Sequence, residues 1–201
     1  MDLFGSKNKG LIEVPNGKYI FIENFINKKY SDALFQKLIE KIEWKQESMK
    51  IYGKELKFPR LTAWYGDDDK LYSFSGITLK PKGWTSELSY LKKKIEPICG
   101  VEFNSVLLNL YRDGNDSISW HSDDEKELDK NPVIASVNLG ETRIFQLKHK
   151  TFKNKINIEL THGSLLIMMG EMQHFWKHQV PKTKKKKNAR INLTFRVIKN
   201  Y

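Results

Sequence analysis

The sequence contains one cysteine, no long apolar run and no internal repeat. Cys99 on its own cannot form an internal disulfide bond or a cysteine-rich zinc site. No apolar segment approaches the roughly 20 residues that span a bilayer, and the start of the chain, MDLFGSKNKG, lacks an apolar signal core. These absences argue against a disulfide scaffold, a membrane protein and a secreted protein. We expect an intracellular protein, cytoplasmic in a bacterium and nuclear in a eukaryote.

Acidic residues are outnumbered, with 24 Asp and Glu against 35 Lys and Arg and a formal net charge of +11. This basic balance favours a polyanionic partner, most simply nucleic acid. A lysine-rich proteome would give the same excess without such a partner, so charge alone does not decide. With 39% apolar and 29% charged residues, the chain has the composition of a globular protein. We expect one domain over residues 1–201 that acts as a monomer, away from membranes.

Helical periodicity is confined to the first half of the chain. Apolar residues at helical spacing behind a Ser-Asp start predict a capped amphipathic helix over 31–42. A second helix is predicted over 86–95, ending ahead of Pro97, and 18–22 is predicted to be a short strand.

From Phe103 onward, short β-rich segments are separated by Gly, Asn, Asp or Lys clusters. Strands without intervening helices are typical of a sandwich, barrel or jelly roll. We therefore expect an α+β, mainly β fold, with helices in 1–102 and the β core in 103–201. The Lys-rich run 182–187 is predicted to be an exposed loop between strands. The predicted strands are VLLNLY (106–111), IASVNLG (134–140), RIFQL (143–147), INIEL (156–160), SLLIMM (164–169) and RINLTFRV (190–197).

The segment NLYRDGNDSISWHSDDE, residues 109–125, carries the clearest chemical signal. His121 and Asp123 are two residues apart and follow a stretch with strand character. In a strand, both side chains would project from the same face. A histidine and a carboxylate are two thirds of the 2-His-1-carboxylate arrangement that suits non-haem Fe(II) and oxygen chemistry. An acidic cluster in a basic chain is consistent with a bound cation.

The third ligand has four candidates downstream of this pair. His149 lies in KHK, His162 lies in THG, and His174 and His178 both lie in HFWKHQVP. Most histidines are ordinary surface or core residues, and the spacing does not separate these four. The residues by themselves leave the choice open.

The C-terminal strand candidate alternates between polar and apolar residues without a break. One face carries Arg190, Asn192, Thr194 and Arg196. In an ordinary half-buried strand this face would meet water. Two arginines framing an amide and a hydroxyl would alternatively clamp a dicarboxylate, because guanidinium groups suit bidentate carboxylate binding. In the strand 106–111, Asn109 and Tyr111 likewise share a face and offer an amide and a phenol.

In their order along the chain, these motifs resemble the AlkB family of Fe(II)/2-oxoglutarate-dependent dioxygenases, and most closely its nucleic-acid repair members. The motifs are NxYRDG, HxDDE, IASVNLG, HGSLLIM, WxHxVP and RxNLTFR, preceded by PRLTAWYG (59–66) and YSFSG (72–76). Each motif alone is weak, but their joint occurrence in order is specific. The resemblance implies a double-stranded β-helix (jelly-roll) core with N-terminal helices and a nucleotide-recognition lid.

The resemblance also implies the site. Fe(II) would be held by His121, Asp123 and His178. Arg190 would grip the distal carboxylate of 2-oxoglutarate, and Arg196 would lie near its keto-acid end. The rest of the cosubstrate pocket would comprise Asn109, Tyr111, Asn192 and Thr194.

The implied reaction uses Fe(II), 2-oxoglutarate and O2 to demethylate N1-methyladenine and N3-methylcytosine in DNA, with RNA as a second candidate. It would release formaldehyde, succinate and carbon dioxide. Both lesions are cationic, so Asp124 and Glu125 beside the metal aspartate would attract them by Coulomb interaction. The competing interpretation of these two acids is a solvated turn.

Chemistry on a base in a duplex requires that the base leaves the stack. Tyr72 and Phe74 align with the family's lid residues and would hold the flipped base, although aromatic residues at this spacing are also typical of a core. Tyr52, Gly53 and Lys54 lie where duplex-acting relatives carry a hairpin that enters the stack. The Lys-rich run would contact phosphates, and its alternative is a solvated turn.

Three other functions are compatible with parts of this pattern. A dioxygenase of the same fold that acts on protein or lipid would not need the basic charge. A catalytically silent nucleic-acid-binding protein would keep the ligand set and both arginines without using them. A zinc hydrolase would accept two histidines and one aspartate, but it would have no use for the arginine pair.

Overall fold

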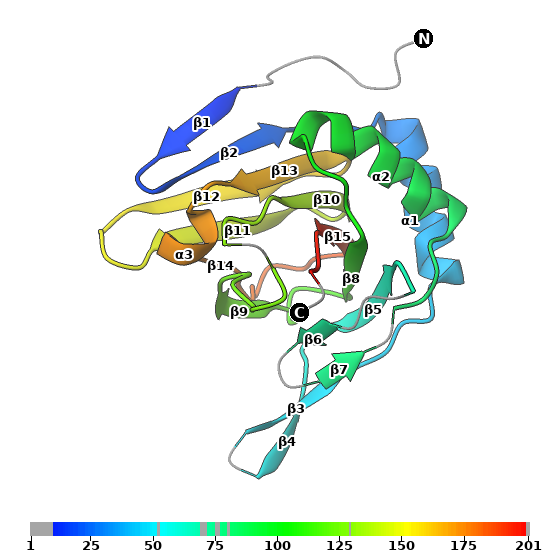
Figure 1. Cartoon of the computed structure of the whole chain (residues 1–201). Helices are drawn as coiled ribbons and strands as arrows, with labels where there is room; N and C mark the ends of the chain where they lie inside the picture. Colours follow the sequence, from blue (N-terminus) through cyan, green and yellow to red (C-terminus); the bar gives the residue numbers. More distant parts are fainter. Residues whose placement is uncertain are drawn as a thin grey trace.

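The chain forms two facing antiparallel β-sheets, with two helices on the outer side of the larger sheet, in the computed structural model (Figure 1). The structure describes residues 10–51, 53–68, 72–74, 77–79, 81–128 and 130–199, and for 50, 51, 72–74 and 77–79 it describes the backbone alone. The α+β, mainly β class and the jelly-roll arrangement predicted from the sequence are confirmed.

Within the described residues, seven strands form the larger sheet and four form the smaller one, and neighbouring strands are antiparallel. The larger sheet has the order β1 (Leu11–Val14), β2 (Gly17–Ile22), β13 (Ser164–Met169), β10 (Ile134–Gly140), β15 (Arg190–Arg196), β8 (Ser105–Tyr111) and β5 (Leu61–Gly66). The smaller sheet has the order β12 (Lys155–Leu160), β11 (Arg143–His149), β14 (Trp176–Val180) and β9 (Ile118–His121).

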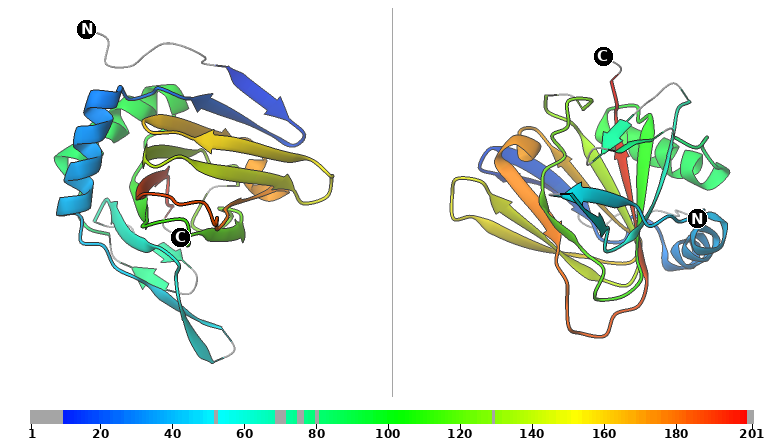
Figure 2. Two further views of the ribbon diagram at one scale, coloured as in Figure 1. Left: turned by 180° about the vertical axis from the view of Figure 1, so that it is seen from behind. Right: turned by 90° about the horizontal axis from the view of Figure 1, so that it is seen from below.

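The central strands of the larger sheet are buried on both faces, whereas the edge strand β1 is exposed. Every side chain of β8 and β15 is buried. On the outer side, Leu108 and Leu193 pack with Leu38 of α1 (Lys28–Lys41) and Leu91 of α2 (Ser86–Cys99) in one apolar cluster. Figure 2 shows both helices on the same side of the molecule. A polar residue on either face of β15 is therefore enclosed, which excludes the alternative of a water-facing polar face on this strand.

The smaller sheet is buried on one face only. Along β11, buried residues alternate with half-buried ones. Its inner side chains, such as Phe145 and Leu147, join residues of the larger sheet in a second apolar cluster. This cluster lies between the sheets and surrounds the cavity described below. The six β-rich segments predicted downstream of Phe103 all form strands, and the strand character expected ahead of Asp123 is present as β9. Strand β14 was not predicted, because its sequence WKHQV is short and polar.

Both predicted helices exist with shifted ends. The amide oxygen of Asn27 accepts from the backbone N–H of Tyr30 at 2.9 Å and caps α1, so the predicted start at Ser31 is wrong and Ser31 lies inside the helix. The end of α2 ahead of Pro97 is also wrong. Proline removes one hydrogen bond in the exposed last turn, which is a modest loss, and Gly100 then ends the helix at a positive φ of 68°.

Residues before 103 contribute more than helices. Strands β1, β2 and β5 come from this part and belong to the larger sheet. Two hairpins, β3 (Ser48–Ile51) with β4 (Lys54–Lys57) and β6 (Tyr72–Phe74) with β7 (Ile77–Leu79), lie together near β5 where a lid was expected (Figure 1). In the described part of the chain, no helix is long and apolar enough to cross a membrane.

Candidate metal and cosubstrate site

His121, Asp123 and His178 come together between the two sheets. One ligand atom from each lies within 4.8 Å of the others, and within the described residues no second group of three or more His, Cys, Asp or Glu residues does this. His121 ends β9 and is directly opposite His178 on the neighbouring β14. Asp123 lies two residues beyond the end of β9, so the expectation that it shares a strand with His121 is wrong. The chain turns there and still brings its carboxylate to the histidines.

Burial prepares these groups to bind a cation. It lowers the pKa of His178 to about 3 and also lowers the pKa of His121, so both imidazoles are neutral at neutral pH. Burial alone would raise the pKa of Asp123, but the Arg196 guanidinium and then His178 outweigh it and hold that pKa near 2. Neutral imidazole and ionised carboxylate are the forms that coordinate a metal ion.

Hydrogen bonds fix the orientation of the three side chains. The Nδ1 atom of His121 lies 2.8 Å from the carbonyl oxygen of Ser119. A carbonyl only accepts, so Nδ1 carries the proton and Nε2 keeps its lone pair for a metal. Arg196 Nη2 donates to Asp123 Oδ1 at 2.7 Å, while the Asp123 backbone N–H donates to Gln173 Oε1 at 2.9 Å. One aspartate oxygen is thereby held by a cation and the other faces His178 at 3.9 Å.

The remaining histidine candidates lie elsewhere. His149 stacks on Phe152 with ring centroids 4.5 Å apart. His162 accepts from the backbone N–H of Gly140 and lies 3.1 Å from Asp32. The Nε2 atom of His174 contacts the carbonyl oxygen of Lys130. Each has a local structural partner, which agrees with the exclusion that the family resemblance implied.

The six predicted cosubstrate residues line the same cavity as the three candidate ligands: Asn109, Tyr111, Arg190, Asn192, Thr194 and Arg196. They come from two neighbouring strands, because β15 pairs with β8 in a register that places Arg190 beside Tyr111 and Asn192 beside Asn109. Strand alternation turns all of them toward the space between the sheets.

Arg190 provides the test of whether this cavity suits a dicarboxylate. Its side chain is 1% exposed and its Nη2 donates to Asn138 Oδ1 at 2.5 Å. The Nε and Nη1 atoms have no hydrogen-bond partner among the described residues. Burial lowers the pKa of Arg190 to about 10, so it remains a cation at neutral pH. A buried cation with two free donors is costly unless a ligand accepts from them, and a carboxylate fits this requirement.

Arg196 lies at the end of the cavity where the candidate metal ligands are, which is where the family resemblance would put the keto-acid end of 2-oxoglutarate. It is buried and forms an ion pair with Asp123. This arrangement places the guanidinium beside the candidate metal ligands rather than free at the far end of the cavity. The structure thus separates the two arginines: Arg190 presents free donors, and Arg196 supports the aspartate.

Two polar residues on β10 that contact the predicted pocket residues were missed from the sequence, and one of them, Ser136, lines the cavity. Asn138 accepts from Arg190, and Ser136 Oγ accepts from Asn192 Nδ2 at 2.7 Å. Both line up across β10 and β15, with Asn138 opposite Asn192 and Ser136 opposite Thr194. The signal was available in IASVNLG, where polar residues alternate with apolar ones as they do in the C-terminal strand.

A larger groove of about 580 Å³ opens beside the cavity and shares Ile118 and His121 with it. Its other walls come from the β3–β4 hairpin, the segment after it, β9 with the following loop, and the Lys-rich run. They comprise Met49, Leu56, Lys57, Phe58, Pro59, Arg60, Ser117, Ser119, Trp120, Ser122, Glu125 and Lys182.

The residues predicted to contact the nucleotide lie in different places, and only one of those described lines the groove. Glu125 lines the groove, whereas Asp124 is exposed and lies 3.6 Å from Lys150 Nζ. Gly53, with a φ of 78°, and the exposed Lys54 lie in the β3–β4 hairpin. Tyr72 and Phe74 are in β6, where the structure describes the backbone alone.

One predicted contact, Tyr52, lies outside the described residues. The Lys-rich run 182–187 is a loop between β14 and β15, as predicted, and Lys187 forms an ion pair with Glu141 at 2.8 Å.

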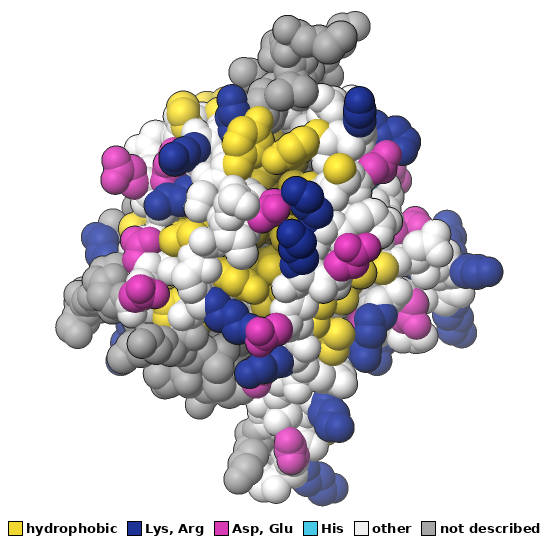
Figure 3. Space-filling model, turned by 90° about the vertical axis from the view of Figure 1, so that its right-hand side faces the viewer, with side chains coloured by type: hydrophobic (Ala, Val, Ile, Leu, Met, Phe, Trp, Pro, Cys, Tyr) yellow, Lys and Arg dark blue, Asp and Glu magenta, His cyan; other side chains and the backbone are white. Residues whose placement is uncertain are grey.

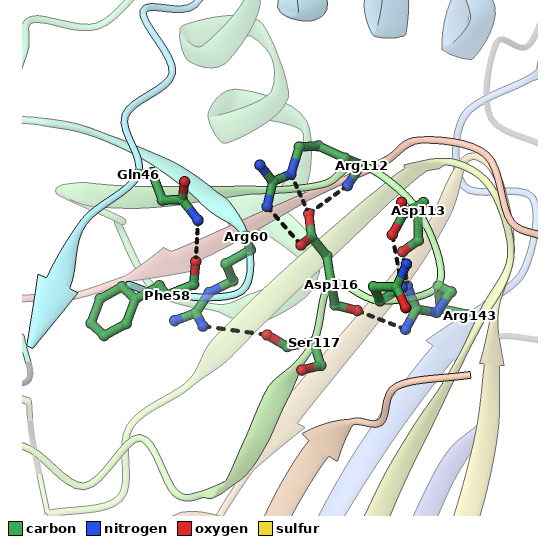
Figure 4. Close-up of polar contacts among 9 residues, drawn as sticks. Gln46, Phe58, Arg60, Arg112, Asp113, Asp116, Ser117 and Arg143 are labelled. Carbon is green, nitrogen blue, oxygen red and sulfur yellow. Dashed lines mark hydrogen bonds and ion pairs between the residues drawn. The ribbon is translucent and has the colours of Figure 1, made fainter. Parts of the chain in front are cut away.

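The exposed Arg112 and the buried Arg143 position the loop that leads into β9. Asp116 accepts from the backbone N–H and the guanidinium of Arg112, and Arg143 donates to the carbonyl oxygens of Asp113 and Asp116 (Figure 4). Arg143 also donates to the carbonyl oxygen of Pro181, which ties this loop to the segment after β14. Arg143 thereby links the loop before β9, which carries His121, to the segment after β14, which carries His178.

Arg60 is a further residue that sequence reasoning missed. It is 4% exposed and donates through Nε to Asn109 Oδ1 at 2.8 Å. Its guanidinium also lies over the Phe58 ring and donates to the carbonyl oxygen of Ser117 (Figure 4). Arg60 thus connects a groove wall with a cavity residue. The motif PRLTAWYG contains it, but a single arginine ahead of an apolar strand does not reveal burial.

Comparison with known proteins agrees with this geometry. Residues 18–196 match the family model of the 2OG-Fe(II) oxygenase superfamily. The chain is 42% identical over 207 residues to "Alpha-ketoglutarate-dependent dioxygenase alkB homolog 3" of Bos taurus, covering 96% of the chain and 72% of that protein. Its identity to the Homo sapiens homolog 3 is 41%, with 87% of the chain and 64% of that protein covered.

A second group of relatives carries a more specific name. The chain is 38% identical to "DNA oxidative demethylase ALKBH2" of Homo sapiens, covering 85% of the chain and 70% of that protein. Among solved structures, "The structure of OsALKBH1" superimposes with a TM-score of 0.64 at 15% identity, covering 94% of the chain and all of that one, which supports the fold. The chain belongs to the AlkB family of Fe(II)- and 2-oxoglutarate-dependent dioxygenases.

Proposed function

We propose that the chain oxidatively demethylates N1-methyladenine and N3-methylcytosine in DNA, and also in RNA, releasing formaldehyde and succinate. The observation that carries this proposal is the meeting of two cavities at His121. The inner one holds the free donors of Arg190, and the outer one is an open groove wide enough for a base. Relatives named DNA oxidative demethylases support the substrate class.

Each cavity has its own task in this proposal. His121, Asp123 and His178 hold Fe(II), and the free donors of Arg190 grip the distal carboxylate of 2-oxoglutarate. When bound, Fe(II) would supply the activation of O2: one oxygen atom would be used as 2-oxoglutarate is oxidatively decarboxylated to succinate and carbon dioxide, and the other would convert the N-methyl group to an unstable N-hydroxymethyl group that releases formaldehyde. The apolar cluster between the sheets excludes water around the inner cavity.

The groove residues select the base. Among the described residues that line the groove, Glu125 is the one with an acidic side chain, and a carboxylate there favours a cationic methylated base over a neutral one. The half-buried Trp120 offers aromatic surface to an unstacked base. We keep Tyr72 and Phe74 as the lid residues and Tyr52 as the stack-entering residue, on the family resemblance alone. Asp124 contributes only to the local field, since it is exposed and lies near Lys150.

We further propose that a single domain over residues 1–201 carries this activity as a monomer inside the cell, away from membranes. The sheet that mixes strands from both halves of the chain supports the single domain. Sedimentation at micromolar concentration tests the monomer, and a dimer would contradict it.

The test is anaerobic loading with Fe(II) and 2-oxoglutarate, followed by air and oligonucleotides that carry one N1-methyladenine. Single- and double-stranded DNA and RNA are compared, with mass spectrometry of the base and assay of succinate. We expect demethylation that disappears in the His121→Ala variant. Succinate without demethylation would retain the oxygenase and reject the substrate.

A further inference from the structure

Three lysines form a row across the outer face of the smaller sheet. Lys148 on β11 is opposite Lys155 on β12 and opposite Lys177 on β14. Cross-strand partners project from the same face, and this face is the outer one because Lys155 and Lys177 are exposed while the neighbours of Lys148 on β11 are buried. Figure 1 shows these three strands side by side.

Such a row is unfavourable in the free protein. Neighbouring strands are roughly 4.8 Å apart, and like charges directly opposite each other destabilise a sheet. Among the described residues, Lys148, Lys155 and Lys177 form no ion pair with an acidic side chain. A polyanion bound across the row would relieve this repulsion.

The helix side of the molecule shows the contrasting pattern. There Lys37 pairs with Glu87 and Lys82 pairs with Glu43. Figure 3 views this side and shows acidic and basic side chains interspersed over it. The lysine row is therefore a local arrangement and not only a consequence of the overall charge.

Trp120 joins the lysine row to the groove. It is half-buried on β9, lines the groove next to His121, and has Lys148 Nζ 4.4 Å from its ring centroid. Next to the lysine row, Gln146 and Gln179 are opposite each other on β11 and β14 and add amide groups to the same face. An aromatic ring beside lysines and amides offers both stacking and phosphate contacts.

We propose that the outer-sheet patch, defined as Trp120, Lys148, Lys155 and Lys177, binds the single strand that flanks the reactive nucleotide. The lysines contact successive phosphates, and one flanking base stacks on Trp120. This inference rests on the proposed function, and it specifies where the nucleic acid leaves the groove. A single strand is the occupant because a paired, stacked base cannot present its face to Trp120.

Binding to the loaded enzyme under anaerobic conditions tests the patch. The probes are a trinucleotide and a strand of about twelve nucleotides, each with one N1-methyladenine, since single-strand sites span roughly 4–16 nucleotides. In the Lys148→Gln/Lys155→Gln/Lys177→Gln variant, the longer strand should bind about tenfold more weakly at low salt. The slope of log affinity against log salt concentration should become shallower by about 2, because three single-strand phosphate contacts are lost.

A matched variant controls for net charge. Lys29→Gln/Lys41→Gln/Lys93→Gln removes the same charge from exposed positions on α1 and α2 and should keep the wild-type salt dependence. An equal change in both triple variants, or no change in the patch variant, would overturn the proposal.

Substitutions of Trp120 test stacking separately from charge. Trp120→Ala should weaken the longer strand about tenfold, and Trp120→Phe should restore most of this loss because phenylalanine still stacks. Equal binding by both variants and the wild type would reject the stacking contact. Demethylation by the wild type combined with a salt dependence that ignores the patch would reject the patch and keep the proposed function. Binding that depends on the patch, without demethylation by the wild type, would keep the patch and reject the proposed function.

Discussion

The two sheets of this molecule have the same strand geometry but opposite relations to water. The central strands of the larger sheet are enclosed on both faces, with helices outside and the cavity inside. The smaller sheet alternates buried and half-buried residues along β11 and faces solvent on one side. A polar residue therefore has a different environment in the two sheets. On the smaller sheet it is an ordinary surface residue or a binding contact, whereas on β15 it is enclosed and needs a partner.

The enclosed polar residues are the informative ones. Arg190, Asn192 and Thr194 are each at most 8% exposed, and burying them costs free energy unless they are hydrogen-bonded. Asn192 and Thr194 have partners within the sheet, but Arg190 keeps two free donors. The difference between the sheets thus identifies the place where a ligand completes the structure.

Removing a candidate metal ligand should give the largest loss of activity. Both candidate histidine ligands, His121 and His178, come from the smaller sheet. We expect His178→Ala to lower succinate formation by more than about 100-fold, which exceeds the loss typical of residues that only orient a metal ligand. Metal analysis should show a parallel loss of bound iron. The control is His174→Ala, from the same HFWKHQVP segment, which should keep iron and activity. Equal losses in both variants would contradict the assignment.

Truncating one buried leucine should show how much more stability the enclosed sheet contributes. Leu193 is fully buried against the helices, so Leu193→Ala should cost about 3 kcal/mol of the free energy of unfolding. The matched change Ile144→Ala, on the half-buried outer face of β11, should cost about 1 kcal/mol or less. Urea unfolding of both variants measures the difference, and equal costs would remove the distinction between the sheets.

Replacing the cation of the enclosed sheet should change cosubstrate binding. Arg190→Lys keeps the charge but loses bidentate geometry, so the KM for 2-oxoglutarate should rise about 30-fold, the equivalent of about 2 kcal/mol. Steady-state assays at varied 2-oxoglutarate and at varied oligonucleotide measure both constants. A rise confined to the KM of the oligonucleotide would place Arg190 outside the cosubstrate pocket.

The smallest expected change is a loss of stability in the helices that cover the larger sheet, where Glu87 lies in the first turn of α2. A hydrogen bond from its own backbone N–H lowers the pKa of Glu87 to about 2, with help from the Ser86 hydroxyl. A lowered folded-state pKa stabilises above the unfolded value near 4.5, and this contribution is lost as the pH falls from 4.5 to 2. Glu87→Gln should cost about 0.3–1 kcal/mol at neutral pH, after screening, and nothing near pH 2.

Thermal unfolding across this pH range checks the Glu87 prediction. The difference in Tm between the variant and the wild type should shrink toward low pH. A difference that stays constant with pH would show that the side chain contributes by packing and not by charge.

Local signals in the sequence were sufficient for much of the fold. Alternation and β-propensity placed the strands downstream of Phe103, and the helices were found with errors at their ends. The ends failed because capping is decided by single hydrogen bonds, as Asn27 and Pro97 show. β14 was missed because its polar side chains weaken the strand pattern, and β9 was anticipated only as a stretch of strand character that was expected to reach Asp123.

The sequence by itself determined the chemistry of the site. The His-x-Asp pair, the alternating C-terminal strand and the order of the motifs specified the family. The residues alone left four histidines open for the third ligand, and the family resemblance selected His178. These features depend on residue type and short spacing, which a sequence displays directly.

Only the tertiary structure decided which distant residues meet. The pairing of β14 with β9 puts His178 opposite His121, and the closure of two sheets buries Arg190 with free donors. The row of Lys155, Lys148 and Lys177 likewise exists only through the register of three strands. Register is set by the packing of whole faces and not by local periodicity, because shifting a strand by one residue exchanges its faces.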